Sequence, residues 1–176
     1  MVLGMTKKSP QKQRVYFNEF NVVLGNTGYL PLVSGLLRAF AETSDVVKEN
    51  YSFEPFLFRV DCADTILDAY ESPSVAAFSL AMWNEQLSLH IAREVKRRWP
   101  DCLIVVGGAQ VPHDPTEYFI EHAFIDVAVR GEGEEAFTKL LERNLANSPI
   151  FPTCRGEIPY PAPVCATRKI NRSIAT

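Results

Sequence analysis

Short apolar runs alternate with longer amphipathic stretches through the middle of the chain. Residues 75–80 and 103–106 show no polar alternation, which is typical of strands covered on both faces. Pro55 interrupts another run, which indicates a strand at the edge of a sheet. In all, the runs predict five strands. The first ends at residues 21–24, and the other four span residues 53–60, 75–80, 103–106 and 125–129.

The stretches that follow these runs have helical periodicity. In the clearest of them, Leu87, Ile91 and Val95 recur every four residues. The predicted helices are residues 31–41, 63–70, 84–99, 116–122 and 134–145. Strand and helix alternate five times, so we expect an α/β fold with a parallel, doubly wound sheet of five strands and helices on both faces. Among such Rossmann-like or flavodoxin-like sheets, the order 2-1-3-4-5 is common.

Two changes in composition bound the predicted domain. The chain is polar before Val15 and rich in proline after Leu145. We therefore expect a disordered N-terminal tail at residues 1–14, one ligand-binding domain at 15–146, and an extended or mobile C-terminal tail or linker at 147–176.

Composition excludes several classes of protein. Of the 176 residues, 18 are basic and 21 acidic, a net charge of -3 that gives no large basic field for nucleic acid. No run approaches the roughly 20 apolar residues that cross a bilayer, and the N-terminus lacks the apolar core of a signal peptide. We expect a cytoplasmic protein with reduced thiols and no membrane association.

The cysteines form no C-x-x-C pair of a zinc ribbon or thioredoxin motif; they are Cys62, Cys102, Cys154 and Cys165.

Glycines gather where the predicted strands end. In an open parallel sheet, ligands bind outside the carboxyl ends of the strands. Three of the four loops there contain glycine, which lets another molecule approach the backbone closely. One such loop alone could use glycine for a tight turn, but together they favour a ligand at this edge. The glycines are Gly25, Gly28, Gly107, Gly108, Gly131 and Gly133.

Other ligand classes match this edge poorly. Residues 25–30 lack the third glycine of a dinucleotide fingerprint and the lysine and hydroxyl of a P-loop. Residues 78–80 hold no aspartate, so the phosphate acceptor of a receiver domain is missing. His113 is the only histidine at the edge, and the carboxylates of Glu132 and Glu134 suit a helix start. The sequence shows no catalytic set of residues.

Four stretches in order resemble one family. They are Gly-Tyr-Leu-Pro-Leu at 28–32, Ala-Phe-Ser-Leu-Ala-Met-Trp-Asn at 77–84, Ile-Val-Val-Gly-Gly-Ala-Gln-Val-Pro at 104–112 and Val-Arg-Gly-Glu-Gly-Glu-Glu at 129–135. Together they resemble the cobalamin (vitamin B12)-binding domain at the N-terminus of B12-dependent radical SAM enzymes. Of the broader fold's motifs, Ser79 and the Gly107–Gly108 pair are present, Ala81 replaces a leucine, and the Asp-x-His-x-x-Gly loop is absent.

The resemblance implies cobalamin bound base-off and His-off, with no protein histidine on cobalt. Its detached base would enter a slot beside the sheet near Ser79. A Cβ at Gly107 or Gly108 would block that slot, so Gly108→Val should abolish binding and spare the fold. Tyr29, Leu30, Met82 and Trp83 would face the corrin. The full set of expected cofactor-binding residues is Gly28, Tyr29, Leu30, Ser79, Leu80, Met82, Trp83, Asn84, Gly107, Gly108, Ala109, Gln110, Val111, Gly131, Glu132 and Gly133.

The family's iron–sulfur motif, Cys-x-x-x-Cys-x-x-Cys, is absent from this chain. We therefore expect any [4Fe–4S] cluster and SAM to belong to a missing or partner domain, and the chain to be a fragment or a partner of a methyltransferase-type enzyme, not a complete enzyme. Two alternatives stay open: a stand-alone interaction or regulatory domain that has lost the cofactor, and a flavodoxin-like protein that binds FMN or another small ligand.

Overall fold

The computed structural model describes residues 11–24, 27–146 and 164–167. Its main sheet has the order β4-β1-β6-β7-β8-β9, and β5 also pairs with β1. All pairings are parallel except that of β9 with β8. The strands are β1 (Gln13–Asn21), β4 (Tyr51–Phe53), β5 (Leu57–Arg59), β6 (Pro73–Leu80), β7 (Leu103–Gly108), β8 (Val127–Arg130) and β9 (Val164–Thr167).

The predicted order 2-1-3-4-5 is confirmed for the five parallel positions, with two differences. The second position is divided between β4 and β5, because Pro55 has no N–H to donate and the ladder breaks around it. The other difference is β9, an antiparallel strand on the outer edge of β8. Its residues lie in the segment expected to be a linker, while 147–163 and 168–176 lie outside the described residues.

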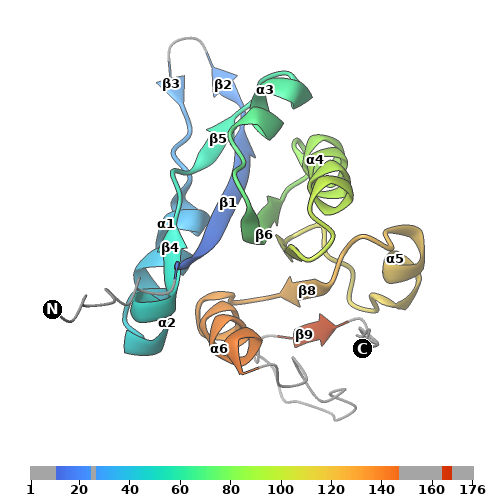
Figure 1. Cartoon of the computed structure of the whole chain (residues 1–176). Coiled ribbons are helices and arrows are strands. Elements are labelled where there is room, and N and C mark those ends of the chain that lie inside the picture. The colour runs from blue at the N-terminus through green and yellow to red at the C-terminus, as the bar shows by residue number, and fades with distance from the viewer. Residues whose placement is uncertain (1–10, 25–26, 147–163, 168–176) are drawn as a thin grey trace, which may run out of the picture.

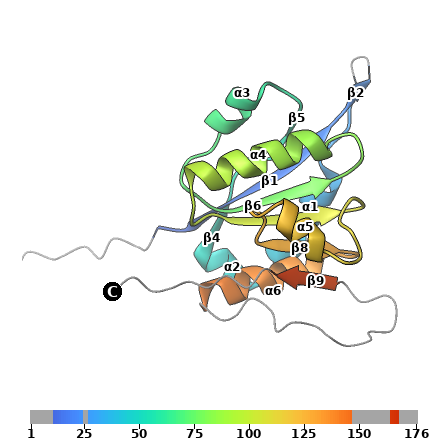
Figure 2. The same cartoon turned by 90° about the vertical axis from the view of Figure 1, so that its right-hand side faces the viewer.

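Helices cover both faces of the sheet, as the alternation predicts (Figure 1). On one face lie α1, α2 and α6, and on the other lie α3, α4 and α5, an arrangement also visible in Figure 2. Their bounds are α1 (Leu32–Ala41), α2 (Asp45–Asn50), α3 (Ala63–Asp68), α4 (Glu85–Arg98), α5 (Thr116–Glu121) and α6 (Glu134–Leu145).

The core has two layers because successive strand side chains point to opposite faces. Toward α4, β6 contributes Phe78 and β7 contributes Ile104 and Val106. Toward α1 and α6, the same strands contribute Ala77 and Val105. Each of these side chains is at most 6% exposed, which explains the absence of polar alternation in the two runs.

The boundaries of some elements differ from the prediction. β1 begins at Gln13, inside the expected tail, and ends at Asn21. A small antiparallel hairpin of β2 (Val23–Leu24) and β3 (Thr27–Gly28) follows it. The short helix α2 had no sequence prediction; the Ser44 hydroxyl caps it by accepting a hydrogen bond from the Val47 N–H. β7 extends through Gly107 and Gly108, so these glycines belong to a strand.

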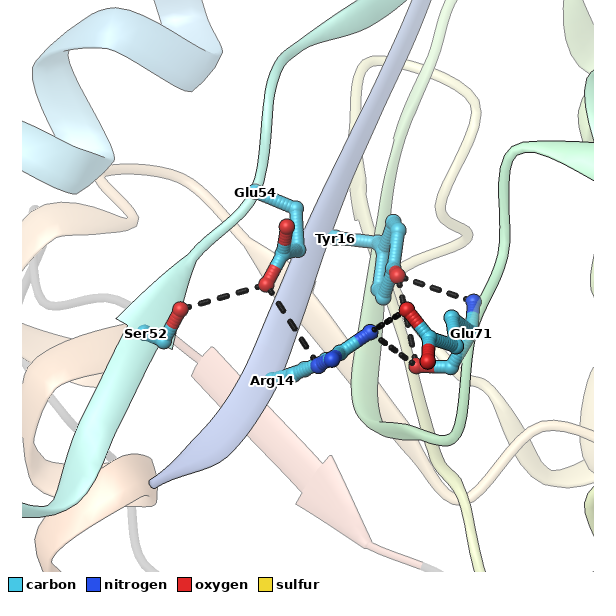
Figure 3. A network of polar contacts seen from close by, with 5 residues as sticks. All are labelled: Arg14, Tyr16, Ser52, Glu54 and Glu71. Carbon is cyan, nitrogen blue, oxygen red and sulfur yellow. Dashed lines mark hydrogen bonds and ion pairs between the residues drawn. The ribbon is translucent and has the colours of Figure 1, made fainter. Parts of the chain in front are cut away.

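A polar network joins three chain segments near the amino ends of the strands (Figure 3). Arg14 on β1 forms an ion pair with Glu71, which lies just before β6. The Nε atom of Arg14 also lies 3.8 Å from Oε1 of Glu54, which follows β4. The Tyr16 hydroxyl accepts a hydrogen bond of 2.9 Å from the Glu71 N–H, and Ser52 donates one of 3.1 Å to Glu54. These contacts fix the spacing of the strands at the end of the sheet away from the expected ligand.

None of the helices in the described ranges is both long enough and apolar enough to span a membrane.

Candidate functional site

A cavity of about 860 Å³ opens at the carboxyl edge of the sheet, on the face covered by α1 and α6. The ends of β6, β7 and β8 form its floor, and side chains of α1 and α6 form its walls. Ligand sites in proteins commonly fall between about 300 and 1,000 Å³. The cavity therefore has the volume of a small-molecule site at the edge where the sequence predicts one.

The strand register arranges the floor in two rows. The outer row, nearer the carboxyl edge, is Ser79, Gly107 and Val129, which pair directly across β6, β7 and β8. The inner row is Phe17, Ala77 and Val105, on β1, β6 and β7. Only the outer row contains a hydroxyl, that of Ser79, and a residue without a side chain, Gly107. The cavity is therefore deepest at this row, and a ligand there can form a hydrogen bond with the floor.

Gly107 keeps the middle of the floor empty. A Cβ added to this residue would meet only Val129, with its carbonyl oxygen at 3.5 Å, an ordinary van der Waals distance. The backbone would thus tolerate a side chain at Gly107, but that side chain would occupy the cavity. The described residues offer the neighbouring Ser79 hydroxyl no hydrogen-bond partner.

Gly108 has a different role, and the expectation for Gly108→Val is wrong. Its φ is +113°, a conformation that residues with a side chain rarely adopt, and a Cβ there would lie 2.4 Å from the Leu80 carbonyl oxygen. Glycine is therefore required at 108 by the backbone of β6 and β7. Substitution would damage the fold before it could test the cavity.

The wall formed by α1 is held from beneath by a buried carboxylate. Glu19 on β1 is 7% exposed, and its Oε2 accepts a hydrogen bond of 2.8 Å from the Ser34 N–H. Ser34 lies in the first turn of α1, where main-chain N–H groups lack helical partners, and the preceding Pro31 supplies no side-chain cap. Glu19 thus performs the capping and anchors α1 over the sheet.

Polar and charged side chains lie at the rim of the cavity. They are His113 in the loop after β7, Arg130 at the end of β8, Glu132 in the loop that follows, and Glu134 at the start of α6. Arg130 also donates a hydrogen bond through Nη1 to the Val111 carbonyl oxygen, which joins the end of β8 to the loop after β7. The rim is therefore polar, whereas the inner floor is apolar.

Four large apolar side chains are exposed near the same edge of the sheet. Tyr29 is 57% exposed, Leu30 77%, Met82 80% and Trp83 59%. They follow the β2–β3 hairpin and β6, and they are outside the lining of the cavity. Such a concentration of exposed apolar surface is typical of a place where a ligand or another protein binds.

The structure divides the sixteen expected site residues into three groups. Those that line the cavity are Ser79, Gly107, Gly108, Ala109, Gly131, Glu132 and Gly133. Those outside its lining but accessible at the surface are Gly28, Tyr29, Leu30, Met82, Trp83 and, in part, Gln110. The remaining three are buried in the fold: Leu80, Asn84 and Val111.

Asn84 is a structural residue in this arrangement. Its side-chain amide donates hydrogen bonds of 3.0 Å to the carbonyl oxygens of Phe20 and Ser79, and its Oδ1 accepts one of 2.8 Å from the Ala81 N–H. At 3% exposure it has no surface left for a ligand. It fixes the turn that presents Met82 and Trp83.

The sequence analysis missed the helical walls of the cavity. Val33, Leu36 and Leu37 on α1 and Phe137 on α6 line it, but their apolar spacing predicted ordinary core packing. Leu36 is 49% exposed, so this stripe is wider than the core requires. The sequence did contain one signal of these walls: the apolar face of the helix after the first glycine-rich loop is broader than core packing needs.

No three His, Cys, Asp or Glu side chains gather to hold a metal ion within the ranges the structure describes. Burial raises the pKa of the Cys102 thiol to about 12, which leaves it protonated and unreactive at neutral pH.

Comparisons with known proteins point to one family. The family described as B12 binding domain matches residues 32–141. The chain is 40% identical over 139 residues to 2-(S-pantetheinyl)-carbapenam-3-carboxylate methyltransferase of Streptantibioticus cattleyicolor, covering 79% of this chain and 20% of that protein. It is 37% identical over 144 residues to the cobalamin-dependent radical SAM methyltransferase TokK of Streptomyces tokunonensis, covering 82% and 21%.

Two solved structures share the fold. The response regulator RcsB of Salmonella typhimurium matches with a TM-score of 0.55 at 13% identity, over 81% of this chain and 64% of that one. The isolated REC domain of RcsB from Salmonella enterica serovar Typhimurium matches with 0.53 at 14%, over 78% and 91%. At these identities the likeness concerns the fold alone. The chain spans about a fifth of the length of its curated relatives, and from the family match over most of the described domain we conclude that it belongs to the B12-binding domain family.

Proposed function

We propose that this domain binds cobalamin base-off and His-off, with the nucleotide tail in the cavity beneath α1 and α6. The observation that carries the proposal is the empty floor of the cavity at Gly107. The backbone there could accept a side chain, but that side chain would fill the cavity. A planar heterocycle can lie against a floor of this kind, between the sheet and the two helices.

The residues of the cavity suit the parts of that tail. The Ser79 hydroxyl is free to donate to a ring nitrogen of the base, and the Phe137 ring and Leu37 offer apolar contact to its faces. The guanidinium of Arg130 and the main chain of 131–133 lie at the rim, where the sugar and phosphate would leave the cavity.

The corrin ring would lie over the carboxyl edge. Tyr29, Leu30, Met82 and Trp83 present the apolar surface that a large flat macrocycle covers. The stretch after β1 holds no histidine at the place of the family's histidine loop, so we infer that this loop gives cobalt no imidazole ligand. His113, at the rim, is the histidine whose replacement tests that inference; His113→Ala should change affinity little.

When bound, cobalamin supplies methyl-transfer chemistry. Because both curated relatives are methyltransferases about five times longer than the matched region, we propose that this domain presents cobalamin to a catalytic unit that contains an iron–sulfur cluster and SAM. The chain's own residues hold and orient the cofactor.

The test is retention of cobalamin by the purified chain. After incubation with hydroxocobalamin and desalting, the protein should stay coloured, and its absorbance spectrum should be that of a corrinoid without benzimidazole on cobalt. A colourless protein would overturn the proposal. Retained flavin would favour the flavodoxin-like alternative, and retention of neither would favour a domain that has lost its cofactor.

Gly107→Leu tests the location. The side chain should fill the cavity and reduce cobalamin affinity by more than about tenfold, while the melting temperature changes little because Cβ meets only Val129. Gly35→Ala is the matched control: a Cβ at this position on α1 meets nothing within 4 Å. It should leave affinity unchanged and add up to about 1 kcal/mol to the free energy of unfolding. Equal affinity of Gly107→Leu and the parent would contradict the location.

A further inference from the structure

The polarity of the cavity changes along its length. The outer row of the floor contains the Ser79 hydroxyl, whereas the inner row, Phe17, Ala77 and Val105, is entirely apolar. Two residues along a strand separate the rows, a distance of about 6.6 Å, which is close to the length of a fused two-ring heterocycle. A base lying over the outer row would therefore direct its far end toward the apolar inner row.

The helical walls repeat this division. Ser34 and Glu134 lie in the first turns of α1 and α6, while Phe137 lies further into α6. The inner end is closed by aromatic rings: the Phe17 ring centroid is 5.3 Å from that of Phe137 and 6.0 Å from that of Phe56. Phe17 and Phe137 are at most 2% exposed, so water has little access there.

Resting on the proposed function, we infer that the cavity selects corrinoids by the ring of the lower base that is remote from the ribose, taking benzimidazole-type and phenol-type bases and disfavouring purines. In a base joined to ribose through its five-membered ring, the six-membered ring lies at the inner end. The benzene ring of dimethylbenzimidazole carries only methyl groups there. Adenine carries an amino group and ring nitrogens, which would leave water for apolar walls without hydrogen bonds.

The affinities of four corrinoids test this inference. The purified chain is titrated with cobalamin, a methylphenol-type cobamide, an adenine-type cobamide and cobinamide, which has no nucleotide. We expect the methylphenol-type cobamide, which has no ring nitrogen for the Ser79 hydroxyl but an equally apolar far end, to bind within about tenfold of cobalamin. The adenine-type cobamide should bind more weakly than both, and at least about tenfold more weakly than cobalamin. Equal affinity for the adenine-type cobamide and cobalamin, both above cobinamide, would overturn the selection and leave the proposed function standing.

The same titration separates the two claims. If cobinamide bound as tightly as cobalamin, the nucleotide tail would not enter the cavity, and both the base-off proposal and this inference would be overturned. If no corrinoid bound, the proposed function would fail with it.

Val105→Thr locates the selecting wall. The substitution puts a hydroxyl on the inner row, where it can hydrogen-bond a purine, so the ratio of cobalamin to adenine-type affinity should fall by about fivefold or more. Val127→Thr is the matched control, because Val127 pairs with Val105 in the same row but lies outside the cavity lining. Both variants place a hydroxyl in the core, so both should be destabilised to a similar extent. An unchanged ratio in Val105→Thr, or an equal change in Val127→Thr, would overturn the assignment to the inner row.

Discussion

At the amino end of the sheet, charged and polar side chains bridge neighbouring segments, whereas the carboxyl end presents glycine, a cavity and exposed apolar side chains. Besides the Arg14 network (Figure 3), the amino end contains Asp126, just before β8. Its carboxylate accepts hydrogen bonds from Lys96 Nζ on α4 and from the Ile104 N–H on β7, each at 2.8 Å. At that end, these charged and polar groups find partners within the protein.

At the carboxyl end, Asn84 and Arg130 have partners within the protein, but other side chains lack them. The Ser79 hydroxyl has none among the described residues, and Met82 and Trp83 are well over half exposed. Gly107 leaves space that a side chain could occupy. One end of this fold therefore supplies stability and the other keeps contacts available for a ligand, so changes at the two ends should be separable by experiment.

Gly108→Val should cause the largest loss of stability. Although Gly108 lies at the carboxyl end, the backbone conformation there requires glycine. The Cβ would overlap the Leu80 carbonyl oxygen at 2.4 Å in a positive-φ conformation, a cost of about 3 kcal/mol or more. We expect a strongly lowered melting temperature or no folded protein, measured by circular dichroism. A folded Gly108→Val with normal melting would show that this backbone can rearrange and would weaken the distinction from Gly107.

Asp126→Ala should have the next largest effect, on stability alone. It leaves the Ile104 N–H without its partner and the partly buried Lys96 ammonium with the Cys102 carbonyl oxygen but no carboxylate, which should cost about 2 to 3 kcal/mol in urea unfolding. Glu135→Ala, which removes an exposed pair with Lys139 on α6, should cost no more than about 0.5 kcal/mol. Cobalamin affinity of the folded Asp126→Ala protein should match that of the parent; a large loss would mean that the two ends are coupled.

The Cys102 thiol, also at the amino end, should make stability fall in alkali. Because burial raises its pKa from 9.0 to about 12, the unfolded chain loses the proton first as pH rises. Its contribution to stability is complete below pH 9 and declines between pH 9 and 12, by up to about 1.4 kcal/mol per pH unit. Cys102→Ala should flatten the decline between pH 9 and 10, where most tyrosines, with an ordinary pKa of about 10, are still protonated; an unchanged slope there would contradict the assignment.

Much of the fold follows from the sequence because burial on both faces leaves a clear trace in strands such as 75–80 and 103–106. The helix at 134–145 is confirmed with both ends correct, since acidic residues begin it and the apolar stripe has helical spacing. Pro55 predicted the edge position, though not the division of that strand into β4 and β5. Pairing between distant segments fixes β9, and a four-residue run inside a proline-rich stretch gives no local sign of it.

The site was predictable as an edge but not as a cavity. Glycine positions located Gly107 and Gly108, but only the register and φ distinguish the one that leaves space from the one the backbone requires. The helical wall of Leu36 and Leu37 was hidden because a residue that lines a cavity has the same apolar character as one in the core. The motif predicts a ligand contact at Asn84, because a position in a motif does not reveal which way its side chain points.

The most direct test of the account is a crystal structure of this domain with cobalamin. We predict that the dimethylbenzimidazole lies off cobalt, over Gly107 and between the sheet and the α1 and α6 helices, with its nitrogen near the Ser79 hydroxyl. A structure in which the base stays coordinated to cobalt, or in which the cavity is filled by the protein's own side chains while cobalamin binds elsewhere, would contradict it.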